Sequence, residues 1–311
     1  MVVLMNKSTL EQWRMLAAVV DHGGFAQAAA AIHKSQSSIN HAVHKLQDQL
    51  GLQLLEVRGR KAHLTDTGQL MLRRARQLLE QAEQLQEVAD SLSRGQEAEL
   101  RLAADEVFPY DHLARALCTL SEDFPHTRVQ LMETVLSGGP EMLAAGEVDL
   151  LIAGSVPPGF LGEPLLSVEF LAVAAPGHPL HQANQTKAQN TGHPLTLQDL
   201  SAHRQIVVRD SARSSRIDSG WLGAEQRWTV SHLETSIDMI SRGMGFAWLP
   251  RPRIEQRLAA GQLKALPLEQ GATRSTTLYL TYADPDRAGP VTRRLGDLLT
   301  SEARLLADSF D

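Results

Sequence analysis

Two short helices are predicted near the N-terminus, where apolar side chains recur with helical spacing on either side of a polar turn. The apolar faces comprise Phe25, Ala28, Ala29 and Ile32 in the first helix, and Ile39, Ala42, Val43, Leu46 and Leu50 in the second. Ser35 stands directly before the second helix, where its side chain can cap the first backbone N–H groups. The pattern predicts two packed helices joined by a tight turn.

The outer face of the second helix carries hydrogen-bonding side chains and no large apolar or acidic one. Its members are Gln36, Ser37, Asn40, His41, His44 and Lys45. Such a face suits the major groove of DNA, where base edges are hydrogen-bonded and phosphates are neutralised. The arrangement is typical of a helix-turn-helix. An ordinary helical hairpin with a solvated polar face has the same periodicity, so this pattern alone leaves both interpretations open.

Segments on both sides of the two helices favour the DNA-binding interpretation. Ser8 and Glu11 have the spacing of a capping box, which predicts a preceding helix against which the pair can pack. After Gly51, residues 54–65 carry a basic cluster between two apolar stretches. This predicts a two-stranded wing whose tip reaches a phosphate or the minor groove.

The N-terminal segment resembles the winged helix-turn-helix of LysR-type transcriptional regulators over about its first seventy positions. The matching positions include Phe25, Ala28, Ala29, Ser35, Gln36, Ser37, Leu46, Gly51, Leu54, Gly59, Arg60, Leu64, Thr65 and Gly68. Some positions depart from the usual pattern of the family, namely Asn40, His41, Gln47, Leu55 and Val57. Because Asn40 and His41 lie on the predicted groove-facing side, these departures leave the operator sequence open.

The resemblance implies a role for each polar residue of the motif. The base readers would be Gln36, Ser37, Asn40 and His41, with Ser35 at the start of their helix. The residues expected to hold phosphates are Lys34, Lys45, Arg58, Arg60 and Lys61. Double-stranded DNA is therefore the expected macromolecular partner.

A long helix with a seven-residue repeat is predicted from residue 66 to residue 94. Its two seam positions hold Met71, Leu78, Leu85 and Leu92, and Ala75, Ala82 and Ala89. Alanine along one seam predicts a closely approaching pair of helices, antiparallel as the LysR resemblance implies. Packing against the core of its own chain is the alternative. Two recognition helices joined in this way would read a palindromic site.

Strand-like and helix-like runs alternate from residue 96 to the end of the chain, which predicts a mainly parallel sheet covered by helices. The expected strands are 100–104, 128–133, 148–153, 205–208, 227–230, 245–249 and 277–282, with helices near 110–123 and 140–145 and from 290. Residues 181–194 are predicted to form a polar loop insertion.

The LysR resemblance implies an α/β protein in three parts: a winged helix-turn-helix over 1–65, a dimerisation helix over 66–95, and an effector-binding domain over 96–311. The last part would resemble periplasmic binding proteins, with lobe I over 96–160 and 270–311 and lobe II over 161–269. The implied assembly is a homotetramer built as a dimer of dimers.

Candidate effector-binding residues follow from the rule that ligands of open α/β sheets sit beyond the carboxyl ends of strands. They are Asp105, Glu106, Val107, Thr134, Val135, Asp210, Ser211, Ser231, His232, Gly243, Met244, Gly245 and Phe246. The arginines at 209, 213 and 216 suit a carboxylate, whereas Asp105 and Glu106 oppose an anion. The chemical identity of the effector is left open.

Charge is distributed unevenly along the 311 residues, whose net charge is −6. Residues 1–65 hold seven Lys and Arg against four Asp and Glu, while residues 96–311 hold nineteen against twenty-seven. The positive excess thus coincides with the predicted DNA-binding segment. A single cysteine, Cys118, excludes an intramolecular disulfide, and no apolar run approaches membrane-spanning length. The expected location is cytoplasmic, with no membrane partner.

Enzymatic and metal chemistry find little support in the sequence. It contains no nucleophile elbow, phosphate-binding glycine loop, dinucleotide fingerprint or zinc-protease motif. The pairs His41 and His44, and His178 and His181, lack a further ligand beside them, so no metal or other cofactor is expected. The sequence favours a sequence-specific transcriptional regulator controlled by a small molecule. A small-molecule binding module without a DNA role is the alternative, and an enzyme is the second one.

Overall fold

The protein consists of two compact units, residues 1–94 and 95–311, and each is described by itself. The computed structural model describes residues 8–58, 61–182, 194–214 and 216–308. Gly59 and Arg60 at the wing tip, and most of the predicted 181–194 insertion, lie outside the described residues.

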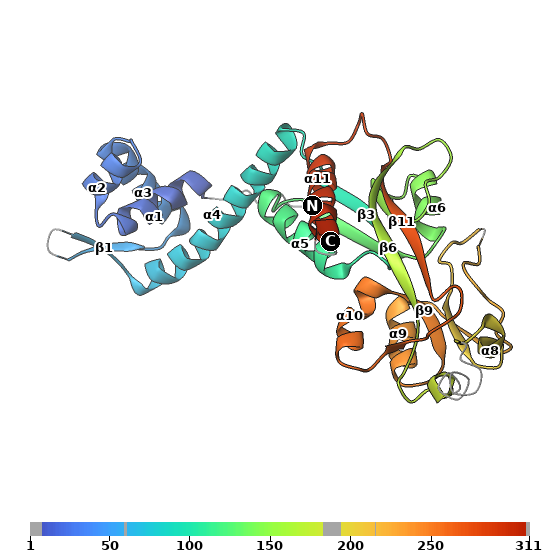
Figure 1. The fold of residues 1–311 in the computed structure, drawn as a ribbon. Coiled ribbons are helices and arrows are strands. Elements are labelled where there is room, and N and C mark those ends of the chain that lie inside the picture. The colour runs from blue at the N-terminus through green and yellow to red at the C-terminus, as the bar shows by residue number, and fades with distance from the viewer. Residues whose placement is uncertain (1–7, 59–60, 183–193, 215, 309–311) are drawn as a thin grey trace. The chain divides into compact units, whose positions relative to one another are not determined.

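The N-terminal unit is a winged helix-turn-helix followed by a long helix (Figure 1). Its elements are α1 (Leu10–Asp21), α2 (Phe25–Ala31), α3 (Gln36–Leu50), the antiparallel strands β1 (Leu55–Arg58) and β2 (Lys61–Leu64), and α4 (Asp66–Ser93). The apolar faces of these helices meet in one core, which includes Leu16, Val19, Ala28, Ile39, Val43, Leu46, Leu54 and Leu72. The helix pair, the wing and the long helix are confirmed.

The start of α1 differs by one residue from the predicted capping box. Thr9, and not Ser8, caps the helix: its hydroxyl accepts from the Gln12 backbone N–H, and the Gln12 side chain accepts from the Thr9 N–H at 2.8 Å. Ser8 instead accepts a hydrogen bond from the Trp13 indole N–H at 3.1 Å. Both Ser8–Glu11 and Thr9–Gln12 satisfy the spacing of a capping box, so spacing alone could not select between them.

A close approach between the wing base and the start of α4 explains two residues of the motif. The Gln47 side-chain oxygen accepts from the backbone N–H groups of Leu54 at 2.7 Å and Leu55 at 3.0 Å. The Gln47 side chain thus ties the base of the wing to α3. A Cβ on Gly68 would lie 2.0 Å from the Leu54 carbonyl oxygen, so only glycine fits there.

The C-terminal unit is built on a nine-stranded mixed sheet with the order β4-β3-β5-β11-β6-β9-β7-β8, and β10 pairs with β6. The strands are β3 (Glu99–Asp105), β4 (Arg128–Thr134), β5 (Leu150–Ala153), β6 (Gly162–Ala174), β7 (Gln205–Val208), β8 (Arg227–Val230), β9 (Phe246–Pro250), β10 (Lys264–Ala265) and β11 (Thr273–Tyr282). The prediction of a mainly parallel sheet was wrong. Parallel pairs occur at both ends, but β6 and β11 run antiparallel to each other and to their neighbours.

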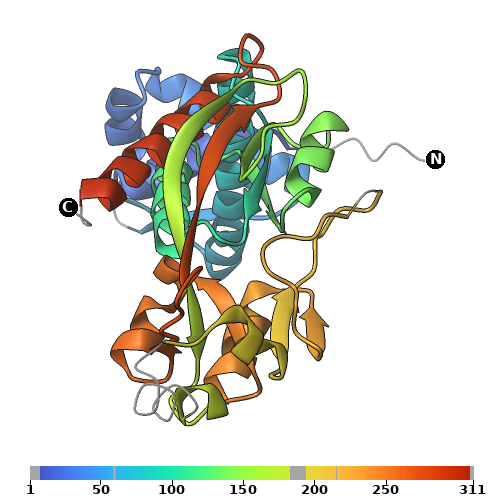
Figure 2. The same ribbon diagram turned by 45° about the vertical axis from the view of Figure 1, so that its right-hand side comes forward.

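This unit has two lobes (Figure 2), and each lobe has its own buried core side chains. The helices are α5 (Tyr110–Asp123), α6 (Gly138–Ala144), α8 (Leu197–Ser201), α9 (Leu233–Ser241), α10 (Arg251–Ala259) and α11 (Pro290–Asp308). The lobe with α5 and α11 has its core on β3, β5 and β11, and the lobe with α9 and α10 has its core on β7 and β9. The long strands β6 and β11 run side by side from one lobe into the other, which explains their opposite directions.

The connection from β7 to β8 contains no helix in its described residues. We call residues 209–226 the strap; residue 215 lies outside the described part. Parallel neighbours such as β7 and β8 are usually joined by a helix.

Among the described helices of the chain, none has the length and apolar character needed to cross a bilayer.

Candidate DNA-binding helix and ligand cavity

The outward face of α3 presents the side chains predicted to read DNA. Ile39, Val43 and Leu46 are fully buried and therefore fix the rotation of the helix about its axis. The side chains on the opposite face are all exposed, namely Gln36, Ser37, Asn40, His41, His44 and Lys45. Ser35 caps the helix by accepting from the Ser38 backbone N–H at 3.2 Å. The hydrogen-bonding groups of this face are available to another molecule.

The residues predicted to hold phosphates are distributed between the turn, α3 and the wing. Lys34 in the turn forms an ion pair with Glu11 of α1. Arg58 and Lys61 are directly opposite each other in the wing register, while Arg60 lies outside the described residues.

The predicted seam of α4 divides into a buried and an exposed part. Ala75 is only 5 % exposed and packs in the core of its own unit, together with the half-buried Met71. Ala75 is thus unavailable to a second chain, which corrects its assignment to an interhelical seam. The beginning of α4 packs against α1, as the alternative of own-core packing supposed. Further along, Leu78, Leu85 and Leu92 are exposed, with Leu85 at 70 %.

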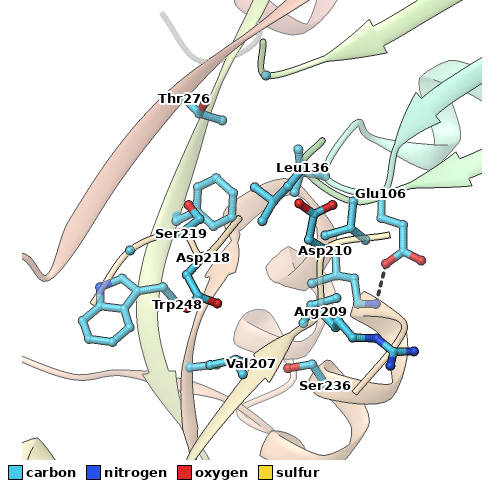
Figure 3. A pocket seen from close by; sticks show the side chains of 18 of the residues that line it. Glu106, Leu136, Val207, Arg209, Asp210, Asp218, Ser219, Ser236, Trp248 and Thr276 are labelled. Atoms are coloured by element: carbon cyan, nitrogen blue, oxygen red, sulfur yellow. Dashed lines mark hydrogen bonds between the residues drawn. The ribbon is translucent and has the colours of Figure 1, made fainter. Parts of the chain in front are cut away.

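A cavity of about 520 Å³ lies between the two lobes (Figure 3). It lies beyond the carboxyl ends of β3, β4 and β7 and against the long strands β6 and β11. Five of the predicted residues line it: Asp105, Glu106, Val107, Val135 and Asp210. The rule that places ligands beyond strand ends therefore led to the edge of the sheet at which this cavity lies.

The other predicted effector residues do not line the cavity. Thr134 is buried, and the Ser211 hydroxyl accepts from the Val135 backbone N–H at 2.9 Å. Ser231 accepts from Arg209, and His232 contacts Glu106 from outside the cavity wall. Gly243, Met244 and Gly245 precede β9 and Phe246 is its first residue, so all four stand at the amino end of a strand parallel to β7, away from the edge at which the cavity lies. Phe246 is fully buried in the core.

Several cavity residues project from positions that the strand-end rule does not cover. They comprise Phe170 of β6, Trp248 of β9, Arg274 and Thr276 of β11, Ser236 of α9, and Asp218, Ser219, Gly220 and Trp221 of the strap. Residues directly opposite each other in antiparallel strands project to the same face of the sheet. Phe170 pairs with Arg274 and Ala172 with Trp248, so these side chains share one face. No local pattern in the sequence marks such pairs.

The carboxylates of Asp105 and Glu106 at the end of β3 have different environments. Asp105 is 7 % exposed and accepts from the backbone N–H groups of Val107 at 3.1 Å and Leu136 at 3.2 Å. Burial raises the pKa of Asp105 to about 7, and these two hydrogen bonds oppose the rise only in part. Glu106 accepts from the Leu233 backbone N–H at the first residue of α9, and from His232 at 3.0 Å.

Asp210 is held by donors from both lobes. It is 3 % exposed and accepts from the backbone N–H groups of Ser137 at 3.2 Å, Ala212 at 2.9 Å and Ile217 at 2.8 Å, and also from the Ser137 hydroxyl. Desolvation raises the pKa of Asp210, but the hydrogen bonds from Ser137, Ile217 and Ala212 outweigh it and lower the pKa below its ordinary value. Glu106 and Asp210 thus each join their own lobe to a helix start in the other lobe.

A winged helix-turn-helix joined to a two-lobed α/β unit with a cavity between the lobes defines a DNA-binding protein that can respond to a ligand. Residues 10–69 match the family described as bacterial regulatory helix-turn-helix protein, lysR family. Residues 93–304 match the family described as LysR substrate binding domain. The chain therefore belongs to the LysR family of transcriptional regulators, as the sequence resemblance implied.

Known proteins are similar over most of the chain. The uncharacterized HTH-type transcriptional regulator YeeY of Escherichia coli K12 is 30 % identical over 268 residues, which span 83 % of this chain and 82 % of that one. The probable regulator YhaJ of the same organism is 30 % identical over 84 % of this chain and 86 % of its own. The solved structure of full-length LysG from Corynebacterium glutamicum with bound effector Arg has a TM-score of 0.51 at 20 % identity and covers 95 % of this chain and 98 % of that one.

The family assignment establishes the general function. The protein is a DNA-binding transcriptional regulator with an effector-binding domain, and it belongs to a family of regulators and not of enzymes. The alternatives of a binding module without a DNA role and of an enzyme are set aside.

Proposed function

We propose that α3 lies in the major groove of operator DNA and that its exposed polar face reads base edges. The orientation of this face carries the proposal, because the buried Ile39, Val43 and Leu46 leave Gln36, Ser37, Asn40 and His41 pointing outward. Asparagine pairs well with adenine, which makes Asn40 a specific reader. Lys45 and the wing residues Arg58, Arg60 and Lys61 hold phosphates, and Lys34 does so at the expense of its ion pair with Glu11.

Replacing His41 by alanine should relax base preference while leaving non-specific binding nearly unchanged. Loss of a base contact costs about 1–3 kcal/mol of discrimination at the contacted base pair. The measurement selects preferred duplexes from a random pool with the wild-type protein and then compares affinities for preferred and unrelated duplexes. Lys45→Ala is the matched comparison. Loss of a phosphate contact should weaken binding to all DNA sequences alike and reduce the dependence of affinity on salt concentration. Equal loss on all sequences for His41→Ala would assign His41 to the DNA backbone.

The proposal further includes a homo-oligomer joined through α4 that reads a palindromic operator. The exposed leucines at 78, 85 and 92 recur every seven residues and form an apolar stripe along a part of α4 whose other exposed side chains are mostly polar. Ala82 and Ala89 lie on the same side and permit a close approach. A dimer of dimers brings two such pairs to one operator. The parts of the chain are then a DNA-binding domain over 1–65, a dimerisation helix over 66–95 and an effector domain over 96–311.

Replacing Leu85 by glutamate should weaken assembly at least about tenfold, because it places a charge in a seam that excludes water. Gln84→Glu adds the same charge one residue away on another side of α4 and should leave assembly unchanged. Sedimentation or light scattering over a dilution series measures the effect. An unchanged mass for Leu85→Glu at every concentration would remove the α4 pair from the proposal.

The small-molecule effector binds in the cavity between the lobes and alters their closure in this proposal. A pocket of this volume with apolar walls and convergent polar groups is typical of ligand sites. LysG, whose fold this chain shares, is described with bound effector Arg. A change in lobe closure would shift the relation between paired DNA-binding units and so the bend of the operator. We place this activity in the cytoplasm, in keeping with a single cysteine that excludes an intramolecular disulfide.

A further inference from the structure

Arg274 of β11 is a partly buried cation, and the described part of the chain supplies no acidic partner for it. Its guanidinium makes one long hydrogen bond, from Nη1 to the Ser219 hydroxyl at 3.4 Å, and its buried Nε has no partner among the described residues. No described carboxylate forms an ion pair with it. Burial lowers its pKa, which expresses the cost of removing this charge from water. A charge in such a position destabilises the protein unless a ligand supplies the opposite charge.

The acidic residues that line the cavity do not supply a counter-charge for Arg274. Asp105, Glu106 and Asp210 are each occupied by backbone N–H groups or by side chains other than Arg274. Asp218 stands on the strap and is exposed to solvent. The cavity therefore retains an unmatched positive charge at Arg274, although its acidic and basic residues are mixed.

Two further polar side chains in the wall have no hydrogen-bond partner among the residues that the structure describes. They are the fully buried Ser236 hydroxyl of α9 and the Oε1 atom of the buried Gln205. Both residues line the cavity. Buried polar groups in proteins are nearly always hydrogen-bonded, so orphaned ones facing a cavity indicate a polar ligand.

Aromatic rings form the wall beside Arg274. Its guanidinium lies over the Phe170 ring, 4.6 Å from the ring centroid, and Trp248 projects from the same face of the sheet. The rings of Trp221 and Trp248 are 5.8 Å apart. Trp248 donates its indole N–H to the Gly271 carbonyl at 2.8 Å, which leaves its apolar surface for packing. Such rings favour a flat, apolar ligand body.

The strap covers the guanidinium closely. Gly220 has a φ of +79°, and a Cβ there would lie 2.3 Å from the Arg274 Nη1 atom. Ser219, next in the chain, supplies the hydroxyl that Arg274 contacts. The strap thus passes directly over the charged end of the site, and a carboxylate at Arg274 would also meet the Ser219 hydroxyl.

We propose that the cavity binds an aromatic carboxylate, whose carboxylate pairs with Arg274 and whose ring packs against Trp221 and Trp248. This inference rests on the proposed function, in which the cavity is the effector site. It adds the chemical class of the effector and the residue that selects it. Arg274 contributes charge and a forked set of donors that match a carboxylate.

The test measures binding of benzoate and 2-naphthoate to the full-length protein by calorimetry, with benzamide and 2-naphthamide as neutral counterparts of the same shape. We expect the carboxylates to bind at least about thirty-fold more tightly than the amides, because the amides leave Arg274 without its counter-charge. Arg274→Met should abolish this difference. Arg251→Met removes an exposed arginine outside the cavity and should retain it.

Thermal unfolding without ligand distinguishes a ligand-binding role of Arg274 from a structural role. Without ligand, Arg274→Met should unfold at the same temperature as the wild type or higher, because methionine removes an unpaired charge and keeps the volume. A lower unfolding temperature would show that Arg274 is structural and would overturn the inference. Equal affinity for carboxylates and amides, no detectable binding of the carboxylates at millimolar concentration, or undiminished carboxylate binding by Arg274→Met would also overturn it.

The outcomes distinguish this inference from the proposed function. If amines, sugars or neutral aromatics raise the unfolding temperature and Trp248→Ala abolishes their effect, the cavity is an effector site and only the carboxylate class is wrong. If no class of compound binds, while DNA binding persists, the effector role of the cavity fails together with the inference.

Discussion

Raising the pH from about 4 to about 7 should remove on the order of 4 kcal/mol of stability from the C-terminal unit through Asp105 alone. Burial raises the pKa of this carboxyl from 3.8 to about 7. Between these values the unfolded chain loses its proton and the folded chain retains it. Unfolding therefore becomes more favourable as the pH rises, and the loss is complete once the pH exceeds the folded pKa.

The contribution of Asp105 is isolated by comparing wild type with Asp105→Asn in urea denaturation from pH 4 to pH 8. Asparagine does not titrate, so the free energy of unfolding of the variant should lack this decrease with rising pH. Asp111→Asn removes an exposed carboxylate at the first turn of α5 and controls for the change in net charge. The comparison is necessary because Asp210, whose pKa is lowered, contributes stability that disappears as the pH falls. Parallel pH profiles for wild type and Asp105→Asn would show that Asp105 is ionised in the fold at ordinary pH.

Replacing Asp210 by alanine should cost about 3–5 kcal/mol of the free energy of unfolding of the C-terminal unit. The carboxylate is 3 % exposed and accepts from Ser137, Ala212 and Ile217. Alanine leaves these donors unpaired in a site that water enters poorly. Urea denaturation measures the loss, and faster hydrogen exchange at the amides of Ser137 and Ile217 would locate it.

Asp218→Ala is the matched control, because Asp218 lies on the same strap but is exposed to solvent. Its stability should stay within about 0.5 kcal/mol of the wild type. A loss below about 1 kcal/mol for Asp210→Ala would mean that solvent replaces the carboxylate, and the junction between the lobes would not depend on it.

The paired roles of Glu106 and Asp210 bear on how the lobes move. Glu106 accepts from the first residue of α9 in the opposite lobe, and Asp210 accepts from Ser137 next to α6. Separation of the two lobes at these contacts would break both hydrogen bonds. A ligand that shifts the lobes therefore has to supply interactions of comparable strength.

The helix-turn-helix was predictable in detail because its information is local. The spacing of Ile39, Val43 and Leu46 determines which side of α3 is buried, and this side determines which residues face outward. The error at α1, where Thr9 and not Ser8 caps the helix, came from two overlapping matches to one short pattern. Ala75 was misassigned because the seven-residue repeat continues into a part of α4 that packs in its own core.

The sequence by itself determined most of the elements, the family and the edge of the sheet at which Asp105, Glu106 and Asp210 gather, since the ends of individual strands follow from neighbouring residues. Only the tertiary structure decided that Arg274 lies over Phe170 and that Asp210 meets Ser137. These partners are far apart in the chain, and the register of β6 with β11 and the path of the strap bring them together. Periodicity describes one segment at a time, whereas a cavity depends on the packing of several segments against each other.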